Sequence, residues 1–168
     1  MSRPLIGDPR KPLIVMTPKS LLRHPMAVST LDELTNGRFE PVLHDVATSD
    51  EVERVILTGG KVYYDLRTAR DKANAKVAIL RLEQLYPFPR PMVVDALKGY
   101  PNAKEIVWVQ DEPQNMGAWP FLHERLAALL GPNRTLRYAG RPTSAASATG
   151  SHHRHEEQQR ALVQQALG

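Results

Sequence analysis

The 168-residue sequence contains no cysteine, which excludes disulfide bonds, thiolate metal sites and a cysteine nucleophile. Long apolar runs are absent too, since none approaches the roughly 18 residues of a membrane-spanning helix. The amino-terminal MSRPLIGDPRKP lacks the apolar core of a signal peptide. These absences favour a cytoplasmic protein with no membrane partner.

An extended basic face is also missing. The net charge of +4 arises within residues 1–25, and the remaining sequence is balanced. The basic excess therefore begins in a short amino-terminal segment, residues 1–11, followed by one expected domain over residues 12–168. A nucleic-acid partner is not expected, because binding a long polyanion needs a basic face across the fold.

Apolar runs separated by proline and glycine predict alternating strands and helices. Strands are expected at residues 12–18, 41–46, 52–60, 76–82, 105–110 and 135–140. Helical turns are expected before Gly37, and helices at residues 61–75, 92–100, 119–131 and 152–167. The central strands are continuous runs of Val, Ile and Leu, which indicates burial on both faces. The sequence thus predicts an α/β fold with a doubly wound, mostly parallel sheet of about five strands.

Three loops are expected at the carboxyl edge of this sheet, where α/β proteins bind ligands and partners. They are TGGK (58–61), QLYPFP (84–89) and DEPQNMGAW (111–119). TGGK lacks the spacing of a phosphate-binding loop and favours a tight strand-to-helix turn. Asp111 and Glu112 are adjacent, so they should point in opposite directions and not form an acid/base pair.

Other catalytic signals are weak. His152, His153 and His155 lie close in sequence, but no further ligand follows at a fixed spacing, so we expect a helix start capped by Ser151 and no metal site. No serine lies in a G-x-S-x-G context. The chain therefore shows no self-contained active site.

Five motifs carry a family resemblance: IVMTPKSLLRHP (14–25), GGKVYYDL (59–66), RLEQLYPFP (81–89), WVQDEPQNMGAW (108–119) and LRYAGRPTSAASATG (136–150). In this order they resemble the C-terminal domain of the thiamine diphosphate-dependent decarboxylase component of 2-oxoglutarate dehydrogenase. The resemblance covers the chain from about residue 12 to the end. It implies a fold like the C-terminal domain of transketolase.

The resemblance also implies what the full enzyme does. It oxidatively decarboxylates 2-oxoglutarate and passes the succinyl group to the lipoyl-succinyltransferase core in the citric acid cycle. Thiamine diphosphate and magnesium would be held by upstream domains, so this chain would contribute no catalytic, cofactor-binding or metal-binding residue and would be inactive alone. It would then be an excised domain, a split gene product or a truncated reading frame. A homodimer is implied as well.

In such an enzyme the loops at the carboxyl edge would dock against the thiamine-binding domains and across the dimer. Amides, a close-packing glycine and aromatic anchors suit that role. The expected docking residues are Tyr86, Phe88, Gln114, Asn115, Gly117 and Trp119. The alternative is that QLYPFP and DEPQNMGAW are both ordinary turns of one domain.

A regulatory domain that binds a nucleotide or an acyl-CoA is the alternative function. Basic side chains near the amino terminus would hold the diphosphate of an effector such as acetyl-CoA. The candidate effector-binding residues are Arg3, Lys11, Lys19 and Arg23.

Overall fold

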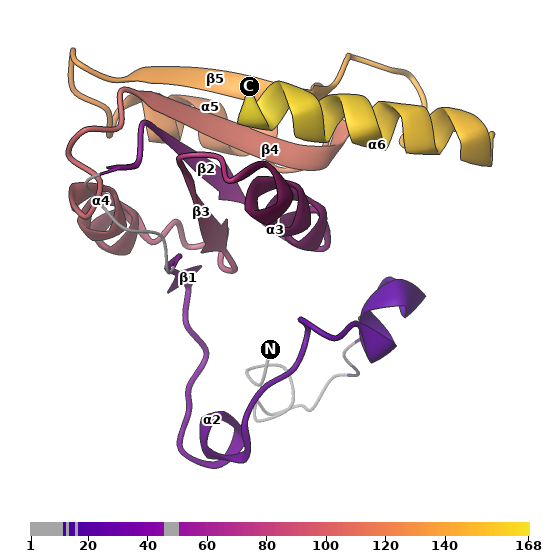
Figure 1. The fold of residues 1–168 in the computed structure, drawn as a ribbon, viewed down its shortest axis with the longest axis horizontal. Coiled ribbons are helices and arrows are strands. Elements are labelled where there is room, and N and C mark those ends of the chain that lie inside the picture. The colour runs from indigo at the N-terminus through magenta and orange to yellow at the C-terminus, as the bar shows by residue number, and fades with distance from the viewer. Residues whose placement is uncertain (1–11, 13, 16, 46–50) are drawn as a thin grey trace. The chain divides into compact units, whose positions relative to one another are not determined.

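The computed structural model describes residues 12, 14–15, 17–45 and 51–168 (Figure 1). Contacts divide the chain into two units, residues 1–37 and residues 38–168. The expectation of one domain over residues 12–168 stays a prediction.

The described part of the first unit contains two short helices, the 3-10 helix η1 (Lys19–Arg23) and the α-helix α2 (Leu31–Thr35). A capping box starts α2: the Thr30 hydroxyl accepts from the N–H of Glu33 at 3.2 Å, and the Glu33 carboxylate accepts from the N–H of Thr30 at 2.7 Å. The predicted helical turns before Gly37 are therefore confirmed. Neither helix contains a buried residue.

The strand predicted at residues 12–18 is wrong for the part of this stretch that is described, namely residues 12, 14, 15, 17 and 18. Ile14 is 82 % exposed and Val15 is 47 % exposed, so these two apolar side chains are not packed into a core. Pro12 and Pro18 also lack the N–H group that a strand uses in its ladder. An apolar run becomes a strand only beside a partner strand, which a single segment of sequence does not reveal.

The second unit is built on one five-stranded sheet in the order β1-β3-β2-β4-β5. Its strands are β1 (Val42–Leu43), β2 (Arg54–Thr58), β3 (Val77–Leu82), β4 (Glu105–Pro113) and β5 (Thr135–Arg141). β1 is antiparallel to β3, and the β2–β3, β2–β4 and β4–β5 pairs are parallel. The predicted mostly parallel sheet is confirmed.

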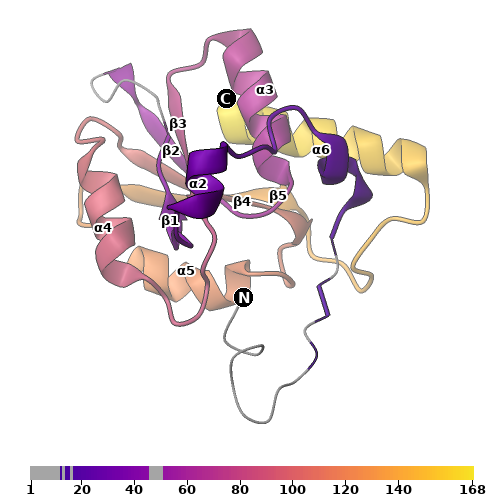
Figure 2. The same ribbon diagram turned by 90° about the horizontal axis from the view of Figure 1, so that it is seen from below.

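Helices cover both faces of the sheet, as a doubly wound fold requires (Figure 2). They are α3 (Val62–Ala73), α4 (Arg90–Lys98), α5 (Trp119–Ala127) and α6 (His152–Leu167). Buried side chains of α4 and α5 join one core cluster, and those of α3 and α6 join the other. Across the described ranges, every helix is too short or too polar to cross a membrane.

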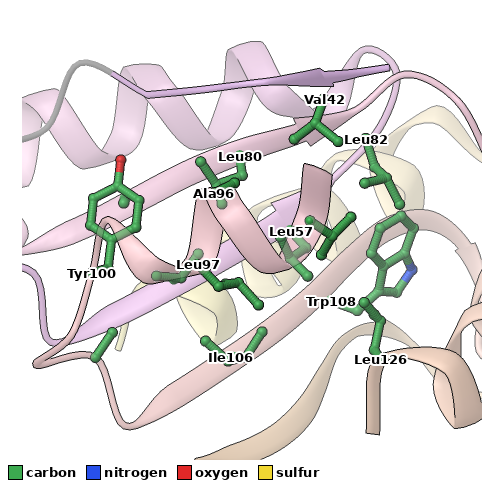
Figure 3. Close-up of a cluster of buried hydrophobic side chains, with 14 of the residues drawn as sticks. Val42, Leu57, Leu80, Leu82, Ala96, Leu97, Tyr100, Ile106, Trp108 and Leu126 are labelled. Carbon is green, nitrogen blue, oxygen red and sulfur yellow. The ribbon is translucent and has the colours of Figure 1, made fainter. Parts of the chain in front are cut away.

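Burial on both faces of the central strands is confirmed by β2, in which Val55, Ile56 and Leu57 are all fully buried. Val55 and Leu57 face the cluster of α4 and α5, and Ile56 faces the cluster of α3 and α6. Figure 3 shows the first cluster, in which Trp108 lies near the carboxyl ends of the strands. This core fixes the strand ends from which the loops leave.

Candidate docking site at the carboxyl edge of the sheet

The three predicted loops meet at the carboxyl ends of β2, β3 and β4, where they surround a pocket of about 510 Å³. TGGK contributes Gly59 and Gly60, QLYPFP contributes Leu85 and Tyr86, and DEPQNMGAW contributes Glu112, Gly117 and Ala118. Because β2 lies between β3 and β4 in the sheet, loops far apart in sequence become neighbours. The predicted meeting of these loops at one edge is therefore confirmed.

Gln110, which is 3 % exposed, anchors the loop that follows β4. Its Oε1 accepts hydrogen bonds from Trp108 Nε1 at 2.9 Å and from the backbone N–H groups of Ala118 at 3.1 Å and Trp119 at 2.9 Å. Ala118 and Trp119 begin α5, and the N-cap residue Ala118 supplies no capping side chain. Gln110 thus caps α5 from the sheet.

The other end of the Gln110 side chain holds the loop itself. Its Nε2 donates to the carbonyls of Met116 at 2.7 Å and Pro113 at 3.1 Å, with that of Glu112 at 3.3 Å. The loop curls tightly over this amide at Gly117, whose φ is +66°. A Cβ at residue 117 would lie 2.9 Å from Nε2, so only glycine fits both the conformation and the space.

QLYPFP places its two aromatic side chains differently. Tyr86 is 83 % exposed and packs edge-to-face near Phe121, with ring centroids 6.5 Å apart. Phe88 is half-buried against the core below. Gln84 Nε2 donates to the carbonyl of Pro87 at 2.8 Å and so closes the turn. The ring of Tyr86 is therefore left exposed, while Phe88 supports the turn by packing on the core.

Trp119 is half-buried and packs against its own core. Its ring lies 5.2 Å from the ring of Tyr138 and 4.8 Å from that of His123. The Tyr138 hydroxyl is 3.1 Å from the carbonyls of Glu112 and Arg141 and donates to either. Burial, followed by the nearby Glu112 carboxylate, raises the pKa of Tyr138 to about 12, so the hydroxyl stays a donor at neutral pH.

Asn115 joins its loop to the segment that follows β5. Its Nδ2 donates to the carbonyl of Ser144 and its Oδ1 accepts from the N–H of Ser144, both at 3.0 Å. Gln114 has an exposed side chain, and its N–H donates to the carbonyl of Arg141 at 3.0 Å. The Asn115 side chain thus makes hydrogen bonds within this chain. The docking roles of all six expected residues stay predictions.

Asp111 and Glu112 point to opposite sides of the strand, as predicted. Asp111 Oδ1 accepts from Gln159 Nε2 of α6 at 2.8 Å, and its Oδ2 lies 4.0 Å from Lys61 Nζ. Glu112 lines the pocket on the other face. In TGGK, Gly60 has a φ of +74°, which suits a tight strand-to-helix turn.

Two of the four candidate effector-binding residues lie in the described part of the first unit, and the other two lie outside the described residues. Arg3 and Lys11 lie outside the described residues. Lys19 and Arg23 are exposed residues of η1. Their role in binding a nucleotide or acetyl-CoA stays a prediction.

The histidine cluster starts α6. Ser151 caps the helix as predicted, with its hydroxyl accepting from the N–H of Arg154 at 3.4 Å. His152 lies 3.6 Å from Glu156, and His153 lies 3.6 Å from Glu157. Over the described ranges, His, Asp and Glu side chains do not gather in groups of three or more that could hold a metal ion.

The sequence analysis did not identify the residues whose hydrogen bonds hold the loop after β4 in place, above all Gln110 and Tyr138. Their partners are mostly backbone groups, whose positions depend on the path of the loop. One signal was present: a polar Gln110 directly follows the apolar run EIVWV. A polar residue at the buried end of a strand indicates that its hydrogen bonds are made inside the protein.

Comparison with known proteins agrees with this architecture. The model of the 2-oxoglutarate dehydrogenase C-terminal family matches residues 28–167. The 2-oxoglutarate dehydrogenase E1 component of Cupriavidus necator is 50 % identical over 170 residues, covering 99 % of this chain and 18 % of the relative. Those of Rickettsia felis and Haemophilus influenzae are each 48 % identical and cover 100 % and 94 % of this chain.

The chain spans less than a fifth of the length of these relatives, at 18 %, 18 % and 17 %. The family match covers most of the chain, including the whole sheet and the three loops of the pocket. The chain therefore belongs to the 2-oxoglutarate dehydrogenase C-terminal family.

Proposed function

We propose that this chain is the C-terminal part of the E1 component of a 2-oxoglutarate dehydrogenase and docks against the rest of that enzyme through the pocket at the carboxyl edge. The whole enzyme would decarboxylate 2-oxoglutarate with thiamine diphosphate and magnesium bound elsewhere. This chain would supply a packing surface and no catalytic residue.

The observation that carries the proposal is the exposed ring of Tyr86 beside a firmly held pocket wall. Tyr86 is 83 % exposed and Leu85 is 38 % exposed, and both line the pocket. The opposite wall is fixed by the hydrogen bonds of Gln110. An exposed aromatic beside a preformed pocket is typical of a docking hot spot, because little side-chain ordering opposes binding.

The first unit supports the same proposal. Leu22, Leu31 and Leu34 are between 71 % and 81 % exposed, and their helices bury none of their residues. Among the described residues of the first unit, these apolar side chains therefore have no core to pack into. Burial of such a side chain stabilises by roughly 1.5 to 3 kcal/mol, so a covering partner surface is favoured.

Family membership supports a proposal for the wider partners. The thiamine-binding domains would be the immediate neighbours, a second copy would complete a homodimer, and the dihydrolipoyl succinyltransferase would receive the succinyl group. A cytoplasmic location is part of the same proposal.

An exchange experiment tests the function. The C-terminal segment of the Cupriavidus necator E1 component is replaced by this chain, and 2-oxoglutarate-dependent reduction of ferricyanide is measured. The exchanged enzyme should retain activity, while the 168-residue chain alone should show none. A correctly folded exchange protein without activity, or decarboxylation by the chain alone, would contradict the proposal.

A further inference from the structure

A second pocket, distinct from the docking pocket, lies between the segment after β5 and the start of α6. Its volume is about 390 Å³. Arg141 at the end of β5, Thr149, and Arg154 and Gln158 on α6 contribute to its walls. None of these residues has a part in the proposed docking.

Unpartnered polar atoms gather around this pocket. Arg141 is 8 % exposed, and its Nε–H has no hydrogen-bond partner among the described residues. The same holds for Thr149 Oγ1 and Gln158 Oε1, so three of the four such buried atoms in the described chain belong to the pocket walls. A buried polar group without a partner is costly, which indicates that a ligand completes the site by accepting from Arg141 Nε and the Thr149 hydroxyl and by donating from an O–H group to Gln158 Oε1.

The charge of the pocket indicates the sign of that ligand. Two arginines line it, and its lining, as far as the chain is described, includes no aspartate or glutamate. Arg141 is held in place on its far side, because its terminal nitrogens contact the carbonyl of Asp111 at 2.8 Å, His155 Nδ1 at 3.0 Å and Gln159 Oε1 at 3.1 Å. The ligand should therefore be an anion.

Arg154 provides the second charge. Its guanidinium makes no hydrogen bond or ion pair with any other described residue, although its backbone N–H is capped by Ser151. It lies in the first turn of the 16-residue helix α6, where the helix dipole adds positive potential. Hydroxyl groups of Ser147, Thr149 and Ser151 complete a wall rich in donors.

We propose that this pocket binds a phosphate group, as inorganic phosphate or as a phosphate monoester. Two guanidinium groups and several hydroxyls offer more donors than a carboxylate can use, whereas a phosphate group presents three or four oxygens to them. The residues that line this pocket all belong to the second unit.

Titration of the 168-residue chain with inorganic phosphate, at constant ionic strength kept with sodium chloride, tests the site. Calorimetry should detect saturable binding, and Arg154→Gln should weaken it about tenfold. Arg160→Gln removes the same charge from an exposed position of α6 outside the pocket and should leave the affinity unchanged. Equal weakening by both variants, or no saturable binding, would overturn the proposal.

Two further arms sharpen the result. Acetate at the same concentrations should bind at least tenfold more weakly than phosphate, and equal affinity would overturn the assignment to phosphate. Thr149→Val removes a hydroxyl that has no partner among the described residues, so it should not lower the melting temperature without phosphate. It should, however, reduce the rise in melting temperature that phosphate produces, and an undiminished rise would exclude Thr149 from the site.

Discussion

The side-chain amide of Gln110 lies directly against Gly117, so that a Cβ at residue 117 would come within 2.9 Å of Gln110 Nε2. Gln110 stands at the end of the apolar part of β4, and Gly117 stands at the bend before α5. The pair therefore links the core of the sheet to the wall of the docking pocket. The buried amide of Gln110 leaves no room for a Cβ at residue 117, and the positive φ of Gly117 also favours glycine there.

Gly117→Ala should destabilise the chain by about 2 kcal/mol, because alanine is strained at a φ of +66° and its methyl group displaces the Gln110 amide. Urea unfolding of the chain measures the loss. Gly131→Ala is the matched control, since its Cβ would meet nothing within 4 Å. Equal effects of the two variants would show that the Gln110–Gly117 contact carries no stability.

Gln110→Leu should cost about 3 kcal/mol or more, because it leaves Trp108 Nε1 and the N–H groups of Ala118 and Trp119 without their acceptor. Hydrogen exchange should rise in residues 111–119 more than in the core strands. Gln164→Leu, at an exposed position of α6, is the control and should change neither quantity. Unchanged exchange in the loop would contradict the anchoring role of Gln110.

The sheet and its helices were predictable because the central strands β2, β3 and β4 contain continuous apolar runs and each helix of the second unit follows a breaker. The strand expected at residues 12–18 was wrong for the described residues 12, 14, 15, 17 and 18, because these have no partner strand among the described residues. The site was predictable as a meeting of three loops, since parallel topology places strand ends together. The internal tasks of Asn115 and Gln110 were not, because their partners are backbone groups of folded loops.

Glu105 should make the free energy of unfolding depend on pH in the acidic range. Burial opposes its ionisation, but hydrogen bonds and charge from Arg137 and Arg54 outweigh burial and lower the pKa of Glu105 below its ordinary 4.5. Because the folded pKa is the lower one, the stabilisation is present above pH 4.5 and is lost as pH falls through the folded pKa.

Glu105→Gln should therefore lower the free energy of unfolding by about 1 kcal/mol at pH 7, a value limited by solvent screening. The gap to the unmodified chain should narrow as the pH falls below 4.5. Glu124→Gln, on the exposed side of α5, is the control. A gap that is the same at pH 7 and at acidic pH would contradict the ion pairs of Glu105.

Tyr138 should make the free energy of unfolding depend on pH in the alkaline range. Its pKa is raised from 10.0 to about 12 in the folded chain, so the unfolded chain loses the proton first and stability falls as pH rises through this window. Tyr138→Phe should cost about 1 kcal/mol at pH 7 through the lost hydrogen bond. The difference in the free energy of unfolding between Tyr138→Phe and the unmodified chain should shrink above pH 10. Guanidinium unfolding at a series of pH values checks both effects, and a disadvantage that stays constant would contradict the buried, protonated hydroxyl.

Docking at the carboxyl edge is tested most directly by hydroxyl-radical labelling of Tyr86, read by mass spectrometry. Tyr86 is 83 % exposed in this chain, and Met92 on α4, 38 % exposed and outside the pocket, serves as the internal reference. The labelling is compared between the 168-residue chain and the exchanged Cupriavidus necator E1 component that contains it. We predict that Tyr86 becomes protected in the intact enzyme while Met92 is labelled as before. Equal labelling of Tyr86 in the two proteins would contradict docking through this pocket.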